Sequence, residues 1–408
     1  MSTGERPKLL FIAPLLPAAG GNGLAMRLGQ FLAAYAKDFD IDLAVVPLAG
    51  GSAADDVFAR RHASRLRQFT LAGPDSWFSL LARLQEPAAR LAAFLAYGRP
   101  SITARLTVSV RRDVAAWCAG RDYRLVHIGR LYLLELAPQV SGPERPVSWV
   151  IDADEDDALA CRQFAAIAAR AGRYDEAAWL MAESAHFAAL TARLLPQAAQ
   201  VFAASRADAN SLARHGAVSV IPNVASKPRR QHVLRQQRLL FVATLGYAPN
   251  AQAVAWFIKY CWPRLHKILP GWRFDVVGGG ADATLQRLMR KPGIIWHGWQ
   301  PDLTAFYARA GVVIVPVASG GGSRIKLLEA AAFGCPIVAT HAGAAGSALL
   351  PKRDFLQADD PTRFIRAVRL CSQRPQRLGE AARQAAAQHH SADLWQTRIR
   401  MIASKHAL

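Results

Sequence analysis

The chain has 408 residues, of which 52% are hydrophobic, and its 50 Lys and Arg residues against 30 Asp and Glu residues give a net charge of +20. This length predicts two globular domains of about 150 to 200 residues each, and the composition excludes a chain too polar to fold. The charge favours a polyanionic partner such as nucleic acid, an anionic membrane or a phosphorylated substrate, although an arginine-rich composition alone gives the same bias.

The cysteines and the apolar segments indicate the compartment of the protein and whether it spans a membrane. The five cysteines are far apart and form no C-x-x-C or Cys/His cluster, which predicts a reduced cytoplasmic chain without structural zinc. No apolar window of about 18 residues is free of charge and proline, so we expect no transmembrane helix. Residues 8–19 are as apolar as a short signal peptide, but Pro14 and Pro17 interrupt them and favour a first strand and loop.

Apolar runs that fit buried strands alternate with helical stretches along the whole chain. In the first half we expect strands at 9–13, 41–46, 125–128, 147–151, 200–204 and 218–221, with the clearest helix at 24–35 behind the glycine turn 20–23. In the second half we expect strands at 239–244, 273–277, 293–297, 312–316 and 336–340, with helices at 250–269, 284–289 and 302–310 and a helical terminal region. This alternation predicts an α/β protein in which helices cover both faces of parallel sheets.

The texture of the sequence changes after Pro222, where a basic, polar tract precedes the next strand. We therefore expect a first doubly wound domain over residues 1–225, a second over 226–390, and a last segment, 391–408, that crosses back to the first. Two such domains facing each other would form a cleft, and ligands of such sheets bind beyond the carboxyl ends of the strands. His389 and His390 lie in a polar tail and are expected to be solvated.

The segment 319–340 carries the strongest chemical signal. It joins a glycine run to a helix that Ser323 can cap, so free backbone N–H groups at 320–322 and the positive end of the helix dipole can hold a phosphate. Arg324 and Lys326 lie in the first turn of this helix, where the dipole disfavours cations. We infer that a requirement other than helix stability placed them there.

Two polar features of the first half have both a functional and a structural interpretation. Asp152 and Asp154 belong to an acidic cluster, 152–157, which follows a strand and could bind Mg²⁺ or position sugar hydroxyls, but which could equally stabilise a helix N-terminus. His127 ends a strand and could face the cleft, or it could be a buried, hydrogen-bonded histidine. The sequence leaves these alternatives open.

Several familiar motifs are absent or weak. The run 278–283 matches the dinucleotide pattern G-x-G-x-x-[G/A], but no acid stands at the expected distance, so an ordinary tight turn is the simpler interpretation. The chain has no P-loop, no H-E-x-x-H and no G-x-S-x-G motif. These absences disfavour a P-loop kinase, a zinc protease and a serine hydrolase.

Taken together, several stretches resemble glycosyltransferase family 4, whose members have the two-domain GT-B architecture, and especially its branch associated with bacterial exopolysaccharide clusters. The resemblance spans nearly the whole chain, and it rests on segments 17–23, 126–130, 150–157, 204–208, 221–224, 241–257, 276–280, 297–299, 310–316 and 319–340. It implies two Rossmann-like domains facing a cleft. It also implies transfer of a sugar, with retention of configuration, from a nucleoside diphosphate sugar to an acceptor.

The resemblance also assigns roles to individual residues. Glu329 would accept hydrogen bonds from the ribose hydroxyls, which suits a carboxylate, and Arg324 and Lys326 would supply positive charge to the leaving diphosphate. His127 would lie near the reacting sugar. The remaining donor-binding residues would be Gly321, Gly322, Ser323, Gly298, Trp299, Gly21 and Gly23, and Asp152 and Asp154 would position the acceptor or sugar.

Two departures from the family pattern limit what can be transferred. Many relatives carry two glutamates as E-x7-E, but Gly321 occupies the position of the first, so the contact with the donor sugar and the identity of that sugar do not carry over. The loop 244–250 also lacks the Lys and Arg usual in the family, and we expect Arg324 and Lys326 to replace them.

The sequence therefore predicts a hexosyltransferase that uses a nucleoside diphosphate sugar, a carbohydrate or lipid-linked acceptor, no cofactor, no metal and no nucleic acid, in bacterial polysaccharide or glycolipid synthesis. The alternatives are a GT-B sugar-nucleotide epimerase and a basic nucleic-acid-binding protein. The basic residues Arg60, Arg61, Arg65 and Arg67 suggest peripheral docking to the inner face of the cytoplasmic membrane. The segment 77–97 could lie in the membrane interface or form a core helix.

Overall fold

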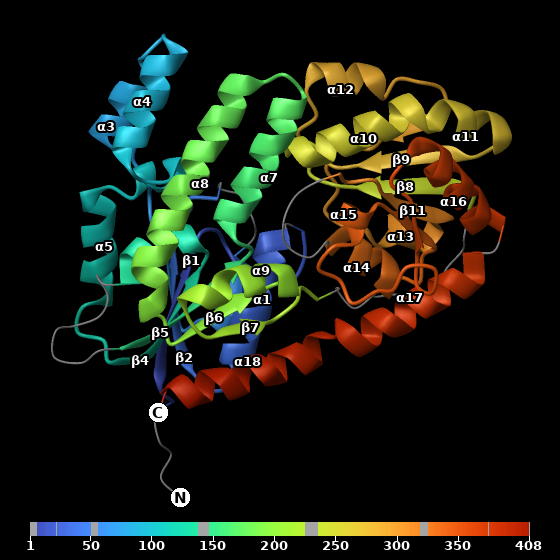
Figure 1. Cartoon of the computed structure of the whole chain (residues 1–408). Helices are drawn as coiled ribbons and strands as arrows, with labels where there is room; N and C mark the ends of the chain where they lie inside the picture. Colours follow the sequence, from blue (N-terminus) through green and yellow to red (C-terminus); the bar gives the residue numbers. More distant parts are fainter. Residues whose placement is uncertain are drawn as a thin grey trace, which may run out of the picture. The chain divides into compact units, whose positions relative to one another are not determined.

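The computed structural model describes residues 6–21, 23–49, 56–137, 147–224, 236–318, 325–373 and 375–407. The chain divides into two compact units (Figure 1). The first consists of Met1–Ile221 together with Asp393–Leu408, and the second of Pro222–Ala392.

The first unit is built on a parallel sheet of seven strands in the order β3-β2-β1-β4-β5-β6-β7. Buried aliphatic residues fill its central strands, as expected when helices cover both faces of a parallel sheet. The strands are β1 (Lys8–Ala13), β2 (Asp40–Val45), β3 (Arg65–Gln68), β4 (Tyr123–Gly129), β5 (Ser148–Asp154), β6 (Gln200–Ala203) and β7 (Val218–Val220).

Alternate residues of β1 point to opposite faces of this sheet and join two different cores. Leu10 and Ile12 belong to one hydrophobic cluster, whereas Leu9 and Phe11 belong to another. The helices of the unit are α1 (Gly23–Tyr35), α2 (Val57–His62), α3 (Ser76–Leu81), α4 (Pro87–Tyr97), α5 (Val108–Cys118), α7 (Asp157–Arg170), α8 (Tyr174–Leu194), α9 (Arg206–Leu212) and α18 (Ala392–Ala407), with short 3₁₀ helices at Ser101–Arg105, Leu131–Leu136, Leu195–Gln197 and Ala213–His215.

The last helix, α18, packs on the first unit although it ends the chain. Ile399 and Ala403 are buried in the same core as Phe11. The guanidinium of Arg400 donates two hydrogen bonds of 2.6 Å to the carboxylate of Asp38. These contacts explain why residues from 393 onward group with the first unit.

The second unit repeats the architecture with six parallel strands in the order β10-β9-β8-β11-β12-β13. Figure 1 shows α10 and α11 on one side of this sheet and α13 and α14 on the other. The strands are β8 (Arg238–Val242), β9 (Arg273–Val277), β10 (Ile294–Trp296), β11 (Val312–Val315), β12 (Ile337–Ala339) and β13 (Leu356–Gln357), and the helices are α10 (Ala248–Tyr260), α11 (Trp262–Ile268), α12 (Ala283–Leu288), α13 (Thr304–Arg309), α14 (Ile325–Ala332), α15 (His341–Ala344), α16 (Pro361–Gln373) and α17 (Pro375–His389).

Three details differ from the sequence prediction. The single helix expected at 250–269 is divided at Cys261 into α10 and α11, and Pro263 stands near the start of α11, where a missing N–H costs little. The edge strands β3 and β13 were not predicted. His390 is not solvated but buried, because its Nδ1 contacts the carbonyl of Asn223 at 3.0 Å and its Nε2 accepts from the N–H of Ala348 at 3.1 Å.

Other expectations from composition can be compared directly with the structure. Residues 8–13 form strand β1, as the interpretation of a first strand and loop requires. All five cysteines are free thiols. Within the described residues, no helix combines the length and the hydropathy needed to cross a bilayer.

Candidate functional site

The centre of the second sheet is a topological switch point. The chain runs outward from β8 through β9 to β10 and then returns to the other side of β8 to form β11. In open α/β sheets, ligands bind beyond the carboxyl ends of the strands at such a point. Residues 244–247 and the start of α10 follow β8, and α14, which carries Lys326 and Glu329, follows β11.

The loop after β9 approaches the loop after β8 so closely that only glycine fits. A Cβ on Gly278 would lie 1.7 Å from the carbonyl oxygen of Ala243, and its φ of +145° disfavours other residues. The N–H of Leu245 donates to the carbonyl of Gly279 at 2.8 Å. The run 278–280 is therefore a tight turn that joins two loops of the switch point, as its structural interpretation proposed.

Gly298 and Trp299 lie against this same turn. The carbonyl of Gly298 accepts from the N–H of Gly278 at 2.7 Å, and a Cβ on Gly279 would lie 3.3 Å from the Cβ of Trp299. The side chain of Trp299 is 73% exposed, which leaves a large aromatic face available at the carboxyl edge of the sheet. Such a face can stack on a planar base.

Glu329 is fixed on α14 by a neighbouring helix. The hydroxyl of Tyr307, on α13, donates to Oε2 of Glu329 at 2.9 Å. Tyr307 is itself buried and stacks on Phe333, with ring centroids 5.2 Å apart. The carboxylate is thus positioned by a packed aromatic pair rather than by solvent.

Burial raises the pKa of Glu329 to about 7, while the Tyr307 hydroxyl and the charge of Lys326 act in the opposite direction. A carboxyl group with this pKa changes charge near neutral pH. Its capacity to accept hydrogen bonds from a ligand therefore depends on pH in this range.

Lys326 reaches from α14 to the first turn of α10. Its Nζ donates to Oδ1 of Asn250 at 2.6 Å and lies 5.8 Å from the ring centroid of Phe241. Asn250 is buried, and its Nδ2 donates to the carbonyl of Thr244 at 2.9 Å. The amide thus connects the ammonium group to the loop that lacks its own Lys or Arg.

Lys326 and Glu329 on α14, and Gly298 and Trp299 after β10, all follow the carboxyl ends of strands of the second sheet. Four other predicted site residues, Gly321, Gly322, Ser323 and Arg324, lie outside the described residues. Their roles stay predictions.

In the first unit, Gly21 and Gly23 belong to the loop between β1 and α1. Gly21 has a φ of +94°, and a Cβ there would meet no atom within 4 Å. The loop glycine is exposed, and α1 begins at Gly23. β1 and β4 are adjacent, so this loop follows a strand of the switch point of the first sheet.

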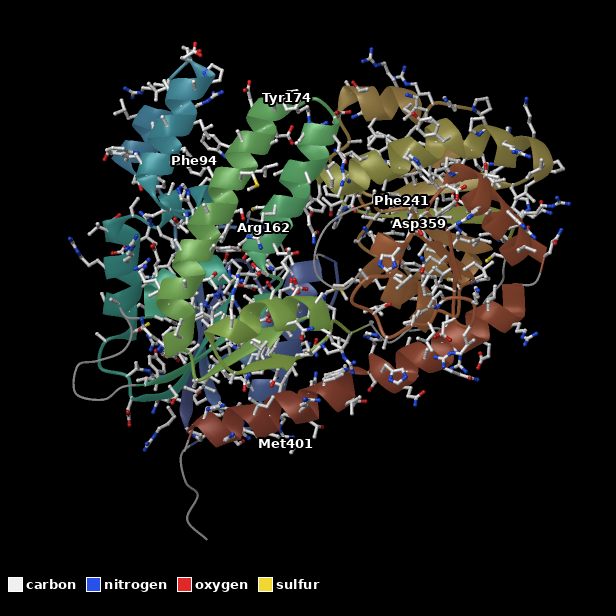
Figure 2. All side chains as sticks on the ribbon, in the orientation of Figure 1. Phe94, Arg162, Tyr174, Phe241, Asp359 and Met401 are labelled. Atoms are coloured by element: carbon white, nitrogen blue, oxygen red, sulfur yellow. The ribbon has the colours of Figure 1, made fainter. Side chains whose placement is uncertain are left out.

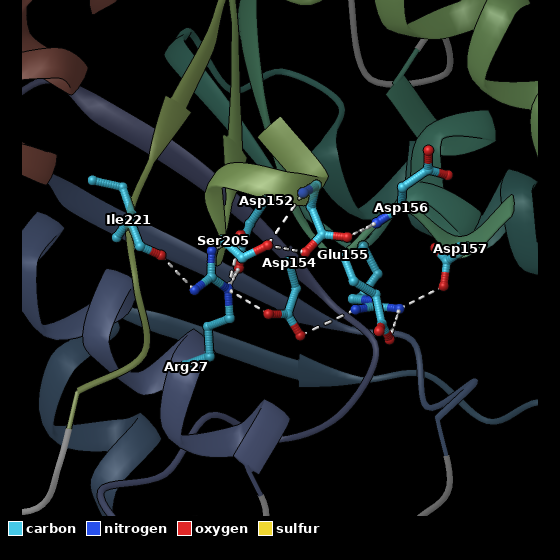
Figure 3. Close-up of polar contacts among 10 residues, drawn as sticks. Arg27, Asp152, Asp154, Glu155, Asp156, Asp157, Ser205 and Ile221 are labelled. Carbon is cyan, nitrogen blue, oxygen red and sulfur yellow. Dashed lines mark hydrogen bonds and ion pairs between the residues drawn. The ribbon is translucent and has the colours of Figure 1, made fainter. Parts of the chain in front are cut away.

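The geometry gives no support to the prediction that Asp152 positions the acceptor or a sugar hydroxyl, which stays a prediction. Asp152 is fully buried, and Arg27 of α1 donates to both of its carboxylate oxygens, with the shortest contact 2.6 Å (Figure 3). Arg27 also donates to the carbonyl of Ile221 at 2.7 Å. The pair holds α1, β5 and the end of the first unit together, and it leaves no exposed oxygen for a ligand.

Asp154 lies between two arginines. Arg27 approaches its Oδ1 at 3.4 Å, and Arg130 donates to its Oδ2 at 3.1 Å. Arg130 also donates to Oδ1 of Asp157 at 2.6 Å, and burial raises the pKa of Asp157 to about 7 against the effect of this arginine. Since the side chain of Asp154 keeps 16% of its surface exposed, its contact with an acceptor stays a prediction.

The rest of the acidic cluster has a structural role. Asp156 caps α7 by accepting from the N–H groups of Ala158 and Leu159, and the hydroxyl of Ser211 donates to its other oxygen at 2.6 Å. Among the described residues, no group of three His, Cys, Asp or Glu side chains is placed to hold a metal ion. Arg27 and Arg130 compensate the negative charge here.

His127 does not face an open cleft. Its ring is fully buried and stacks on Phe11 with centroids 4.3 Å apart, and its Nδ1 contacts the hydroxyl of Tyr35 at 3.1 Å. Burial, with a smaller effect of Arg27, lowers its pKa to about 3. The alternative of a buried, hydrogen-bonded histidine therefore describes this side chain, and its catalytic role stays a prediction without support from the geometry.

Sequence reasoning missed Asn250, Tyr307, Arg27 and Arg130. The first two act through contacts between helices that are far apart in sequence, and no local pattern marks them. Arg27 could have been found, because it is a charged residue in an otherwise apolar helix.

A comparison with protein families finds a match within the second unit. Residues 236–373 match the family model described as "Glycosyl transferases group 1". No curated protein sequence matches the chain.

Solved structures resemble the whole chain at low sequence identity. They include sucrose-phosphate synthase from Thermosynechococcus elongatus, with a TM-score of 0.66, 15% identity and coverage of 98% of this chain and 99% of the other. HepE from Anabaena, in complex with UDP-glucose, gives a TM-score of 0.60, 16% identity and coverage of 98% and 99%. A glycosyltransferase from Rickettsia africae gives a TM-score of 0.57, 12% identity and coverage of 98% of this chain and 98% of the other.

These likenesses and the two parallel sheets confirm the predicted fold class, an α/β protein of GT-B architecture with two Rossmann-like domains. The family match over residues 236–373 supports a glycosyltransferase, and the solved structures show the fold. They do not distinguish family 4, its exopolysaccharide branch or a retaining mechanism.

Proposed function

We propose that the protein transfers a sugar from a nucleoside diphosphate sugar to the hydroxyl of a carbohydrate or lipid-linked acceptor. The observation that carries this proposal is the placement of Glu329 and Lys326 at the switch point of the second sheet, each held by a buried partner. The family match over residues 236–373 supports the same reaction. HepE, which shares the fold, was solved with UDP-glucose.

Each residue of this site has a defined task in the proposal. The carboxylate of Glu329 accepts hydrogen bonds from the ribose hydroxyls, and the face of Trp299 lies beside the base. The ammonium of Lys326 stabilises the charge that develops on the leaving diphosphate, an effect for which one lost donor costs about 10²-fold or more in rate.

The reaction itself exchanges one bond for another. The acceptor oxygen bonds to the anomeric carbon while the bond from that carbon to the phosphate oxygen breaks, and the nucleoside diphosphate and one proton are released. We propose retention of anomeric configuration, a hexosyl donor and no metal or other cofactor. We also propose a cytoplasmic site of action, in polysaccharide or glycolipid synthesis at the membrane.

The experiment is a nucleotide-release assay with a panel of sugar nucleotides, with and without added glycan or lipid-linked acceptors. We expect one donor to give acceptor-dependent release, and NMR of the product to show the anomeric configuration of the donor. Replacing Glu329 with Ala should remove this activity, whereas Glu380→Ala on the exposed face of α17 should keep it. Release of nucleotide without any acceptor, together with an altered free sugar, would instead identify an epimerase.

A further inference from the structure

The two-helix hairpin α3–α4 of the first unit exposes three large apolar side chains. Trp77 and Leu80 on α3 are 51% and 60% exposed, and Leu95 on α4 is 52% exposed. Trp77 and Leu80 are three residues apart and therefore share a helix face. The indole Nε1 of Trp77 donates to the carbonyl of Ala93 at 3.4 Å, which places this face against α4.

The opposite face of the hairpin provides its attachment. Phe94 is fully buried and stacks on Trp179 of α8 at 4.0 Å, and Leu81 and Ala182 complete this small core. Figure 2 shows Phe94 between α4 and α8. The hairpin thus packs on the unit through this core, and the exposed Trp77, Leu80 and Leu95 are not part of it.

The charges near this surface are suited to an anionic partner. Arg83 and Arg90 are exposed, and neither has an acidic partner among the described residues. The neighbouring acid Glu135 is neutralised, because it accepts from Arg99 and Arg111 at 2.8 and 3.0 Å. Glu86 is the one acid within the sequence of the hairpin, residues 76–97.

Of the four arginines that the sequence suggested for docking, Arg60 and Arg65 are paired with acids, whereas Arg61 and Arg67 are exposed. Arg65 pairs with Asp42 at 2.9 Å and lies over the ring of Trp117, and Arg60 pairs with Asp56 at 2.7 Å. Their charge is partly compensated within the unit. The hairpin α3–α4 combines exposed arginines with three exposed large apolar side chains.

We propose that the hairpin α3–α4 docks on an anionic lipid bilayer through its exposed side chains, Trp77, Leu80, Arg83, Arg90 and Leu95. Tryptophan and leucine at such a face enter the interface between headgroups and acyl chains, and arginines beside them attract acidic lipids. A second copy of the chain fits less well. The net charge of +20 makes two copies repel, and three large side chains are far fewer than the about 20 to 30 residues a side of a stable interface.

This inference rests on the proposed function and extends it, because it names the surface of the first unit that would face the membrane containing a lipid-linked acceptor. The two can fail independently, since vesicle binding is measured without donor or acceptor.

The test is flotation of the full chain with vesicles of phosphatidylcholine alone or of phosphatidylcholine mixed with phosphatidylglycerol. We expect binding only to the anionic vesicles, weaker at higher salt. The double variant Leu80→Ser/Leu95→Ser should lower the partition coefficient at least about tenfold, which corresponds to the loss of two partly buried leucines. Arg83→Glu/Arg90→Glu should lower it comparably.

The matched control variants carry comparable substitutions, two apolar-to-Ser changes or two Arg-to-Glu changes, outside the hairpin. Tyr174→Ser/Met181→Ser removes two large exposed side chains, 72% and 51% exposed, from α8, and Arg287→Glu/Arg290→Glu reverses two exposed charges of the second unit. Both should bind as the wild type does. The proposal is overturned by absence of binding to anionic vesicles, by equal losses in hairpin and control variants, or by a dimer in light scattering that the leucine variants dissociate.

Discussion

The hydroxyl of Tyr307 on α13 donates a hydrogen bond of 2.9 Å to Oε2 of Glu329 on α14. Strand β11 separates these two helices in the sequence. This contact fixes Glu329, which lies beside Lys326 in the proposed donor site of the second unit. It also links the protonation of Glu329 to the packing of an aromatic side chain.

The first prediction concerns the pH dependence of nucleotide binding. Burial raises the pKa of Glu329 to about 7, so the carboxylate that accepts ribose hydroxyls is lost as the pH falls below this value. The affinity for a nucleoside diphosphate should therefore rise through pH 7 and level off above it. Calorimetric titration over this range checks the midpoint.

Two variants separate this effect from general changes of the protein. Tyr307→Phe removes a hydrogen bond that lowers the pKa of Glu329, so the midpoint should move to higher pH. Glu329→Gln cannot titrate and should make the pH profile flat near 7. An unchanged midpoint in both variants would rule out Glu329 as the titrating group.

The free energy of unfolding of the ligand-free protein should fall as the pH rises, whereas the affinity for the nucleotide should rise. The folded pKa of Glu329 lies above its ordinary value of 4.5, so its contribution to stability is present below about pH 4.5 and is lost as the pH rises through 7. Denaturation of Glu329→Gln should lack this component. The comparison is a difference between two proteins at each pH, which cancels the titration of all other groups.

A second prediction tests Asn250 as a positioning residue. Its amide accepts from Lys326 and donates to the carbonyl of Thr244, so Asn250→Ala releases the ammonium group from the loop after β8. We expect kcat to fall by about tenfold or more, with a smaller change in the KM for the donor, because the charge is needed most when the diphosphate leaves.

The matched control is Asn210→Ala on the exposed side of α9. It should leave both constants unchanged. Equal kinetics for Asn250→Ala and wild type would remove Asn250 from the account, and loss of donor binding alone would point to a role in the ground state.

A third prediction concerns the buried pair Arg27 and Asp152. Replacing Arg27 with Met leaves a fully buried carboxylate without its cation, which costs about 3 to 5 kcal/mol in comparable cases. The melting temperature should fall by several degrees. The double variant Arg27→Met/Asp152→Leu should recover a large part of this loss, because it removes the uncompensated charge.

A fourth prediction compares two glycines with positive φ. Gly278→Ala would place a Cβ 1.7 Å from the carbonyl oxygen of Ala243, so the turn must shift and the second unit should be strongly destabilised. Gly298→Ala has the same need for a left-handed φ, +67°, but meets no atom within 4 Å. It should cost only about 1 kcal/mol. Similar melting temperatures for the two variants would contradict the close approach of the loops.

The central strands could be predicted from the sequence because continuous apolar runs are required where a parallel sheet is buried on both faces. The edge strands could not. β3 reads Arg65-Leu66-Arg67-Gln68, and its first arginine is neutralised by Asp42 on the neighbouring strand. β13 has two residues, too few for any periodic pattern.

The residues of the candidate sites also fall into two groups, those that the sequence could place and those that it could not. Lys326 and Glu329 share a local pattern, so the sequence could place them together. Asp152 and His127 end or follow strands, where a side chain can face solvent or the core, and distant residues decide which. Arg27 covers Asp152, and Phe11 covers His127, across contacts that only the folded chain defines.

The account is tested most directly by the thermal stability of the protein with a panel of nucleoside diphosphates, compared between wild type, Glu329→Gln and the exposed control Glu380→Gln. We predict that one nucleoside diphosphate raises the melting temperature of the wild type and of Glu380→Gln, since a ligand at 100 times its Kd adds about 2.7 kcal/mol. Glu329→Gln should lose most of this increase. No increase with any nucleoside diphosphate, or an equal increase in Glu329→Gln, would contradict the proposed donor site.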